Sequence, residues 1–381
     1  KTNMGGGLMQ LVAYGAQDIY LTGNPQITFF KVVYRRHTNF SMEAIEQTWN
    51  GTSNATGRCT ATISRNGDLV HRMYLEINPG TVQGNLNNGG VAWINSVELE
   101  IGGQRIDKHS GLWMETWAEL TEPNPSGVVG DSTTAAGTVF QNMSCMGGSD
   151  GDSASMVAGE KIFVPLQFWF CRNPGLALPL IALQYHEVKV ILDHSFSTVS
   201  SDAGSQVLYC DYIYLDTDER RRFAQVSHEY LIEQVQEQDN SSSNELNFNH
   251  PVKELVWSHP NKIKDAASTA CDDDIQLKLN GHDRFAARDF RYFTRVQVWQ
   301  HHSGAGGLEA DGTAGTGNCD DSIGVYSFAL KPEEHQPSGT CNFSRIDNAQ
   351  LTGIPAGFKI FAVNYNVLRI MSGMGGLAYS N

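Results

Sequence analysis

The sequence contains one arrangement typical of nucleophilic catalysis, the pattern Gly-x-Ser-x-Gly at Gly147, Ser149 and Gly151. In hydrolases this pattern exposes a serine hydroxyl only where a buried strand leads into it and a helix follows. Here it lies within "MGGSDGDS", a run of small polar residues that predicts neither element. We therefore expect a loop at this position and no catalytic serine.

Histidines and acidic residues could instead hold a metal ion. None of the spacings His-x-His, His-x-Asp, His-x-Glu or His-Glu-x-x-His occurs among the twelve histidines. His301 and His302 are adjacent, so on a strand they would point to opposite faces as two solvated side chains. The stretches "CDDDI" at 271–275 and "DTDER" at 216–220 lack the glycine and the terminal glutamate of a calcium-binding loop. The sequence therefore predicts no enzyme, no catalytic residue, no cofactor and no metal site.

Asparagine-linked glycosylation is a further modification that the sequence permits. Asn-x-Ser/Thr sequons occur at Asn39, Asn50, Asn54, Asn142, Asn240 and Asn342. Asn142 and Asn240 lie in loop-like surroundings, so we predict these two as the candidate glycosylation sites.

Two stretches that must form β-hairpins resemble each other. In "VELEIGGQRID" (97–107) apolar and acidic residues alternate up to the pair Gly102-Gly103, and in "IQLKLNGHDRF" (275–285) apolar and polar residues alternate up to Asn280-Gly281. Period-two alternation that runs into a Gly-Gly or Asn-Gly pair predicts a hairpin with one buried face. We therefore expect Gly102, Gly103, Asn280 and Gly281 to form the hairpin turns of a domain design that is used twice.

The order of elements around the two hairpins is the same in both halves. Each hairpin is followed by a polar, glycine-rich run, at about 111–159 and at 301–322, then by an apolar strand ending near a proline. Small polar residues are typical of surface loops, so we expect both runs to be exposed excursions rather than core elements.

The chain length and its many glycines and short β-like runs predict an all-β protein built of two domains. We expect two tandem eight-stranded antiparallel jelly-roll β-sandwiches, that is, a double jelly roll. The predicted division is an N-terminal segment at 1–25, a first jelly roll at 26–217, a charged linker at 218–225 and a second jelly roll at 226–381. The first jelly roll would begin with the β-branched and aromatic run 26–36.

The composition argues against two classes of partner. The formal net charge is −14 and the chain has no basic arm, whereas nucleic-acid affinity comes mainly from cationic side chains. The longest aliphatic run, at 176–183, contains a proline and is far shorter than the roughly 20 residues that span a bilayer. No signal peptide is visible at the N-terminus. We expect a soluble protein made in the cytosol, with no direct nucleic-acid contact and no membrane insertion.

Several long blocks resemble one known family. They are "LVAYGAQDIYLTGNPQITFFKVVYRRHTNF", "ELEIGGQRIDKH", "PGLALPLIALQYHEVKV", "HEYLIEQ", "YSFALKP", "QPSGTCNFSRIDNA" and "NYNVLRIMSGMGGLAYSN". In these blocks and in their order, the chain resembles the major capsid proteins of large algal viruses, within the double jelly-roll family of nucleocytoplasmic large DNA viruses.

The resemblance implies a structural function. Three chains would form a homotrimeric capsomer with a nearly hexagonal outline, and many capsomers would tile an icosahedral virus shell. The N-terminal segment would lie toward the capsid interior, near neighbouring capsomers and minor capsid proteins, and the glycine-rich excursions would face outward. The protein would be assembled in the host cytoplasm and reside in the virion. The glycan positions of chlorella-virus relatives do not transfer, because the loop at 351–358 is short here.

Two other classes of function are open to a jelly roll. A secreted carbohydrate-binding β-sandwich would require a signal peptide and a sugar-stacking aromatic patch. A sandwich enzyme would require metal-ligand spacings or paired catalytic carboxylates. The capsid interpretation predicts association without turnover, and the carbohydrate-binding protein is the alternative.

Overall fold

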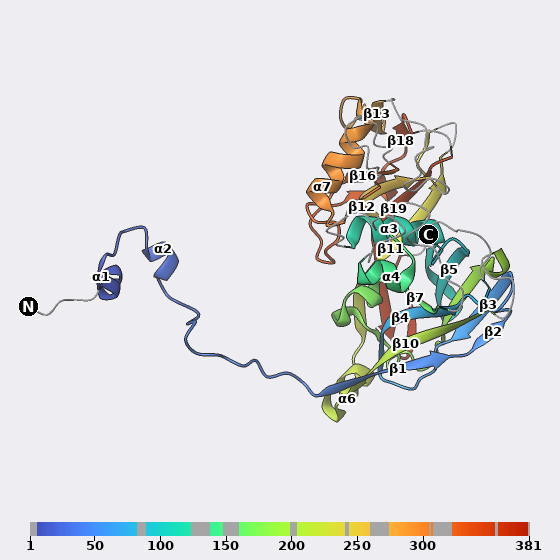
Figure 1. Ribbon diagram of the computed structural model, residues 1–381, viewed down its shortest axis with the longest axis horizontal. Helices are drawn as coiled ribbons and strands as arrows, with labels where there is room; N and C mark the ends of the chain where they lie inside the picture. The colour runs from blue at the N-terminus through green and yellow to red at the C-terminus, as the bar shows by residue number, and fades with distance from the viewer. Residues whose placement is uncertain are drawn as a thin grey trace, which may run out of the picture. The chain divides into compact units, whose positions relative to one another are not determined.

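The computed structural model describes the fold of most of the chain (Figure 1). The described residues are 6–81, 89–122, 138–147, 160–198, 204–240, 244–259, 274–304, 306–307, 322–354 and 357–379. By internal contacts the chain divides into two units, residues 1–39 and residues 40–381.

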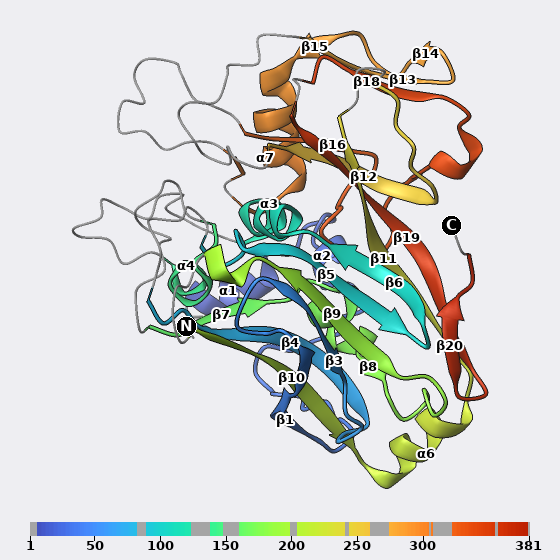
Figure 2. The ribbon, with the colours of Figure 1, turned by 90° about the vertical axis from the view of Figure 1, so that its right-hand side faces the viewer.

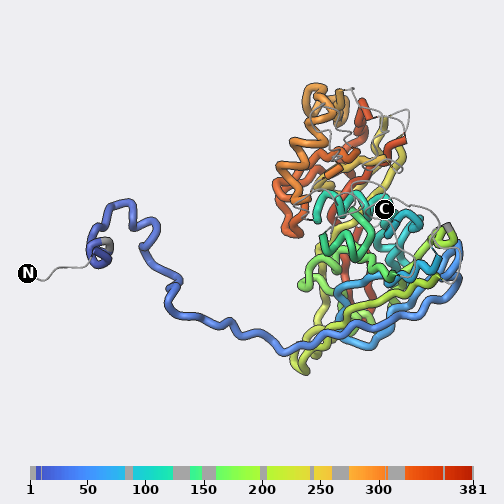
Figure 3. Tube along the Cα trace, viewed as in Figure 1, coloured from blue at the N-terminus to red at the C-terminus, as the bar shows by residue number. Residues whose placement is uncertain are grey.

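The N-terminal unit contains two short helices, α1 (Gly6–Val12) and α2 (Ile19–Thr22), followed by an open stretch without strands (Figure 3). The sequence prediction placed a strand at 26–36 and began the first jelly roll there. In the structure the first strand, β1, begins at Phe40. A β-branched run needs a paired neighbour to satisfy its backbone N–H and C=O groups, and 26–36 has none within this unit.

The first half of the larger unit forms two antiparallel sheets. One has the order β1-β10-β4-β7 with β8 beside β4, and its bounds are β1 (Phe40–Gln47), β10 (Ser205–Leu215), β4 (Leu69–Asn78), β7 (Ile162–Pro165) and β8 (Leu178–Pro179). The other has the order β2-β3-β9-β5-β6, with β2 (Trp49–Gly51), β3 (Gly57–Thr62), β9 (Val188–His194), β5 (Ile94–Ile101) and β6 (Gln104–His109).

The second half repeats this arrangement. One sheet has the order β11-β19-β12-β16, with β17 beside β12 and β20 beside β19, and its bounds are β11 (His228–Asp239), β19 (Lys359–Met371), β12 (Pro251–Ser258), β16 (Ile323–Ser327), β17 (Cys341–Asn342) and β20 (Met374–Leu377). The other contains β14-β13-β15 with β18 beside β13, namely β13 (Asp274–Leu279), β14 (His282–Asp283), β15 (Arg288–Asp289) and β18 (Ala349–Thr352).

The halves match strand for strand between one sheet of the first half and the larger sheet of the second. Strands β1, β10, β4 and β7 correspond in order to β11, β19, β12 and β16, and a two-residue strand pairs with β4 in one half and with β12 in the other. The predicted all-β fold of two tandem jelly rolls is therefore confirmed. Figure 2 shows the first jelly roll, blue to green, below the second, yellow to red.

Each jelly roll encloses its own core. In the first, alternate residues of β4, namely Met73, Leu75 and Ile77, are buried against the other sheet, which contributes Val97 and Leu99 of β5. A second core gathers alternate residues of β12 and β13 in the other jelly roll, among them Leu255, Trp257, Ile275 and Leu277. The alternation that predicted the hairpins thus separates a buried face from the opposite face of each sheet.

The charged stretch predicted as a linker at 218–225 folds as helix α6 (Thr217–Gln225). Asp216 precedes the helix and its carboxylate accepts a hydrogen bond of 2.7 Å from the backbone N–H of Thr217. Asp218 and Glu219 lie in the first turn and Arg222 in the last, where each charge complements the helix dipole. The charge pattern therefore stabilises a helix between the two jelly rolls.

Candidate functional site: the junction of the two jelly rolls

Helix α3 (Gly111–Thr121) lies between the two jelly rolls (Figure 2). It begins after Ser110, whose hydroxyl accepts a hydrogen bond of 3.2 Å from the N–H of Trp113. Met114 and Ala118 are buried in the core of the first jelly roll, and Trp113 and Trp117 in a cluster shared with the second. The expectation of an exposed excursion from residue 111 onward is therefore wrong for 111–121, because both faces of this helix are apolar.

The tryptophans of α3 cover the outer face of the sheet β11-β19-β12-β16. The ring of Trp113 lies 5.1 Å from the ring of Phe361 on β19, and Val256 of β12 and Val325 of β16 belong to the same cluster. The outer face of this sheet is buried by α3 and its inner face by the core of the second jelly roll. Helix α3 therefore joins the two domains through an apolar, largely aromatic contact.

The last turn of α3 is completed by the second jelly roll. The N–H of Gly304 donates to the carbonyl of Leu120 at 2.7 Å, and that of Gly306 donates to Glu119 at 2.9 Å. The hydroxyl of Ser303 donates to the carbonyl of Thr121 at 3.0 Å. Terminal carbonyls that have no partner inside a helix thus find donors in the other domain.

A buried ion cluster reinforces the junction around Glu233 of β11. Its carboxylate lies 2.8 Å from the Arg172 guanidinium, 3.0 Å from the Lys253 ammonium and 3.4 Å from the His335 ring. Arg172 ends helix α5 (Trp169–Arg172) of the first jelly roll and stacks over the Trp117 ring at 4.3 Å. Burial opposes ionisation of Glu233, but the His335 hydrogen bond and the Lys253 and Arg172 charges outweigh it and lower its pKa to about 2. The carboxylate therefore stays charged and holds cations from both domains.

His302 forms a second buried ion cluster, contrary to the expectation of a solvated side chain. Its side chain is fully buried, with Nε2 3.1 Å from Glu254 and Nδ1 3.1 Å from Glu333. The residue follows helix α7 (Gln297–His301) and does not lie on a strand, so the argument from opposite strand faces does not apply. Burial lowers the pKa of His302, but the two carboxylates outweigh it and raise that pKa to about 9. His302 is therefore a charged link between Glu254 and Glu333.

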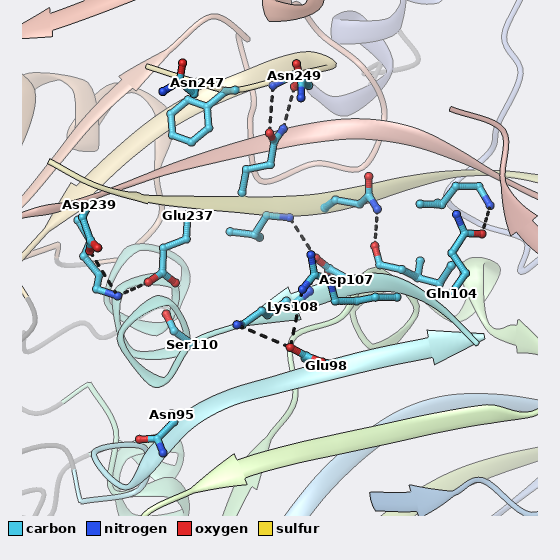
Figure 4. A pocket seen from close by; sticks show the side chains of 18 residues that line it. Asn95, Glu98, Gln104, Asp107, Lys108, Ser110, Glu237, Asp239, Asn247 and Asn249 are labelled. Atoms are coloured by element: carbon cyan, nitrogen blue, oxygen red, sulfur yellow. Dashed lines mark hydrogen bonds and ion pairs between the residues drawn. The ribbon is translucent and has the colours of Figure 1, made fainter. Parts of the chain in front are cut away.

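A polar groove of about 960 Å³ lies along β6 and β11 (Figure 4). The carboxylate of Asp107 accepts a hydrogen bond of 3.1 Å from the N–H of Val235, and the Gln234 side chain donates to the carbonyl of Ile106. On one wall Glu98 lies within 4 Å of three cations, those of Arg58, Arg105 and Lys108. The charged and amide side chains that line the groove mostly bond one another. The hydrogen bonds between β6 and β11 hold these two edge strands together.

The predicted hairpin residues occupy the two turns. Gly102 and Gly103 connect the paired residues Ile101 and Gln104, with φ of 58° and 84°. Asn280 and Gly281 connect Leu279 and His282, with φ of 52° and 76°. Positive φ at both central positions is the geometry of a type I′ hairpin turn.

The two candidate glycosylation sites lie in different settings. Asn142 is exposed on helix α4 (Val139–Ser144), where its amide donates to the carbonyl of Thr138 at 3.1 Å. Asn240 is partly buried at the end of β11, and its amide donates to the carbonyl of Ile354 at 2.9 Å. The structure does not bring either asparagine to the junction.

Several sequence motifs fall outside the described residues. The Gly-x-Ser-x-Gly pattern is described only at Gly147, and the acidic stretch 271–275 only from Asp274. Within the described part of the chain, no group of three or more His, Cys, Asp or Glu side chains is arranged to hold a metal ion. None of the described helices is long and apolar enough to cross a membrane.

Two family models match most of the chain. The model for the N-terminus of major capsid proteins covers residues 28–216, and the model for the large eukaryotic DNA virus major capsid protein covers residues 219–353. The chain belongs to the family of major capsid proteins of large DNA viruses. This confirms the resemblance seen in the sequence and a structural role in forming the capsid. The comparisons do not support the carbohydrate-binding alternative.

Individual relatives agree with this assignment. The chain is 55% identical over 413 residues to the major capsid protein of Pyramimonas orientalis virus, covering 99% of this chain and 100% of the relative. It is 40% identical over 469 residues to that of Paramecium bursaria Chlorella virus 1, with the same coverage. The crystal structure of VP54 of PBCV-1 superposes with a TM-score of 0.75 at 35% identity, covering 93% of this chain and 100% of VP54. The Faustovirus major capsid protein shares the fold, with a TM-score of 0.62 at 12% identity and 94% coverage of both chains.

Proposed function

We propose that this capsid protein assembles as a homotrimer that presents six similar jelly rolls and occupies a six-sided position in an icosahedral shell. The observation that supports the proposal is the strand-for-strand match of β1-β10-β4-β7 with β11-β19-β12-β16 in one unit. Helix α3 and the Glu233 cluster fix the two jelly rolls to each other. Two similar domains held in a fixed orientation allow three chains to fill a nearly hexagonal outline.

The native mass tests the trimer. Each chain has a mass of 41.9 kDa, so light scattering from purified protein should give three times this value. The mass should stay the same over a tenfold dilution, because obligate interfaces of roughly 2,000 Å² or more are stable. A mass of one chain at all concentrations would contradict the proposal.

We further propose that the N-terminal unit contacts neighbouring capsomers and minor capsid proteins at the inner face of the shell. Its apolar side chains are widely exposed, among them Tyr20, Phe29, Phe30 and Tyr34, each at least 85% accessible. The segment 1–39 also carries four Lys and Arg residues and one acid, in a chain whose net charge is −14. An apolar, basic segment suits docking on acidic protein surfaces.

Deletion of residues 1–39 tests this second role. The truncated protein should keep its strands and its trimeric mass, since the larger unit begins at Phe40. It should fail to cosediment with capsid shells assembled from the full chain and purified minor capsid proteins. Normal incorporation of the truncated protein would contradict the proposal.

The remaining expectations are proposals about location and partners. We propose that the protein resides in the virion after assembly in the host cytoplasm, acts without catalytic turnover, and makes no direct nucleic-acid contact. The net charge of −14 supports the last point. Immunogold labelling of infected cells tests the location, and a filter-binding assay with double-stranded DNA at low salt tests the nucleic-acid contact.

The domain boundaries and the glycans are also proposals. We place the jelly rolls on either side of α6, with the first starting at β1. Asn142 is the better glycosylation candidate, because its side chain is exposed whereas Asn240 is partly buried. Peptide mass spectrometry of protein from virions should find any sequon-linked glycan at Asn142 before Asn240.

A further inference from the structure

In both jelly rolls, helices lie in the chain segment that follows the predicted β-hairpin and leads to the matching strands β7 and β16. In the first jelly roll, the connection from β6 to β7 contains α3, whose Trp113 and Trp117 are buried against the second jelly roll. In the second, the connection from β15 to β16 contains helix η3 (Tyr292–Val296) and helix α7. Phe293 and Val298 of these helices face inward and are buried. Trp299 is 80% exposed and Val296 38%, so this helical connection presents a tryptophan to solvent.

The outer face of the sheet β11-β19-β12-β16 is covered by α3 in the second jelly roll. The corresponding sheet of the first jelly roll, β1-β10-β4-β7, has an aromatic surface. Three residues paired across the strands of the second jelly roll lie under α3. Val256 of β12 is paired with Phe361 of β19 on one side and with Val325 of β16 on the other. On the matching sheet of the first jelly roll, Tyr74 of β4 is paired with Tyr209 of β10 and with Pro165 of β7. Because β4, β10 and β7 correspond to β12, β19 and β16, the row formed by Tyr74, Tyr209 and Pro165 is equivalent to the row that α3 covers.

The equivalent row is aromatic and open. The rings of Tyr74 and Tyr209 stack at 5.4 Å, and Phe163 of β7 lies edge-on to Tyr74 at 6.2 Å. All three side chains remain partly exposed. Stacked aromatic rings at a protein surface are typical of binding hot spots.

Charged residues of both signs lie around the two surfaces: Arg291 pairs with Asp289 beside the helical connection, and Lys161 pairs with Glu76 beside the aromatic row. The helical connection carries Arg291 and Arg295 on the turns that precede Trp299. Around the aromatic row, the exposed Glu46 pairs with Tyr209 in register, and Asp211 lies two residues further along β10.

We propose that Trp299 of one copy docks on Tyr74, Tyr209 and Phe163 of the next copy, as α3 docks on the second jelly roll within each chain. This inference rests on the proposed homotrimer and identifies its contact surfaces. The contact joins two different surfaces, so it is heterologous, and in the proposed homotrimer three such contacts close a ring. Around the ring of six jelly rolls, the α3 contact within each chain would then alternate with the Trp299 contact between neighbouring chains.

Single substitutions test the contact. Trp299→Glu should reduce the mass measured by light scattering threefold, from three chains to one, and Tyr209→Arg should do the same. Both changes lie on exposed or partly exposed side chains, so the circular dichroism spectrum should stay that of the wild type. Tyr185→Glu is the matched control, since Tyr185 is 75% exposed on another surface, and it should remain trimeric.

Cross-linking tests the contact directly. The double variant Trp299→Cys/Tyr209→Cys is oxidised with copper phenanthroline, and each single variant is oxidised as a control. Covalently linked chains should form only in the double variant and disappear on reduction.

The possible failures are distinguishable. If the wild-type protein is a monomer, the proposed homotrimer is wrong and this inference falls with it. If the wild type is a trimer but Trp299→Glu is also a trimer and no disulfide links the chains of the double variant, only the inference is wrong. If Tyr209→Cys instead cross-links to Phe30→Cys, the N-terminal unit covers the aromatic row, and the inference is wrong in that case too.

Discussion

The guanidinium of Arg172 lies 2.8 Å from the carboxylate of Glu233, and the pair connects the first jelly roll to the second. Arg172 also stacks on Trp117 of α3, so one side chain contacts both the ionic and the aromatic parts of the junction. The two jelly rolls are therefore fixed to each other by a charged cluster and an apolar cluster that share a residue. A fixed pair of domains is what a capsomer with six similar units requires.

Substitution Glu233→Gln should destabilise the protein by about 3–5 kcal/mol, because it leaves the buried Lys253 without its countercharge. The urea dependence of tryptophan fluorescence measures the change. Glu334→Gln removes an exposed ion pair with Lys331 and is the matched control, with no measurable change expected. Equal effects of the two substitutions would contradict the role given to the buried cluster.

The His302 cluster predicts a loss of stability at alkaline pH. The pKa of His302 is raised from 6.5 to about 9 in the folded protein, so its stabilisation is complete below pH 6.5 and is lost as the pH rises to 9. The loss should amount to about 3 kcal/mol. His302→Gln should be less stable at pH 6 and should show a flatter decline between pH 6.5 and 9. A variant with the wild-type slope in thermal unfolding would show that His302 does not titrate there.

Substitution Trp117→Ala should leave a cavity between α3 and the second jelly roll and cost about 3–5 kcal/mol. Trp117 is 3% exposed and loses both its apolar contacts and the stacked Arg172. Tyr379→Ala removes a ring that is 64% exposed and should change the unfolding free energy by less than about 0.5 kcal/mol. Trp117→Ala with the stability of the control would mean that α3 does not hold the domains together.

Alanine substitutions at the two glycines of the first hairpin turn should destabilise the protein to different degrees. Alanine at Gly103 would meet no atom within 4 Å, so its cost is the strain of a φ of 84°, about 1–2 kcal/mol. Alanine at Gly102 adds a clash, because its Cβ would lie 2.3 Å from the His186 ring. Gly102→Ala should therefore lower the unfolding midpoint further than Gly103→Ala. The reverse order would contradict the described turn.

The β-hairpins could be predicted from sequence because their signal is local. Alternation sets which side chains are buried, and Gly-Gly or Asn-Gly sets the turn. The junction was missed because its signal is non-local. Trp113 and Trp117 are four residues apart, which places them on one face of a helix, but only the fold shows that this face meets another domain.

His302 and the run 26–36 show two other limits of sequence reasoning. The burial of His302 depends on Glu254 and Glu333, which are distant in sequence and meet it only in the folded chain. The run 26–36 has the composition of a strand, yet strand formation also needs a partner, and none pairs with it in the described structure.

The most direct test of the central claim is to image the purified protein by electron microscopy and average the particles. The account predicts particles of three chains with a nearly hexagonal outline and six similar lobes, two from each chain. Particles with three lobes, or with paired lobes whose separation varies from particle to particle, would contradict it, because the two jelly rolls would then not act as equivalent, fixed units.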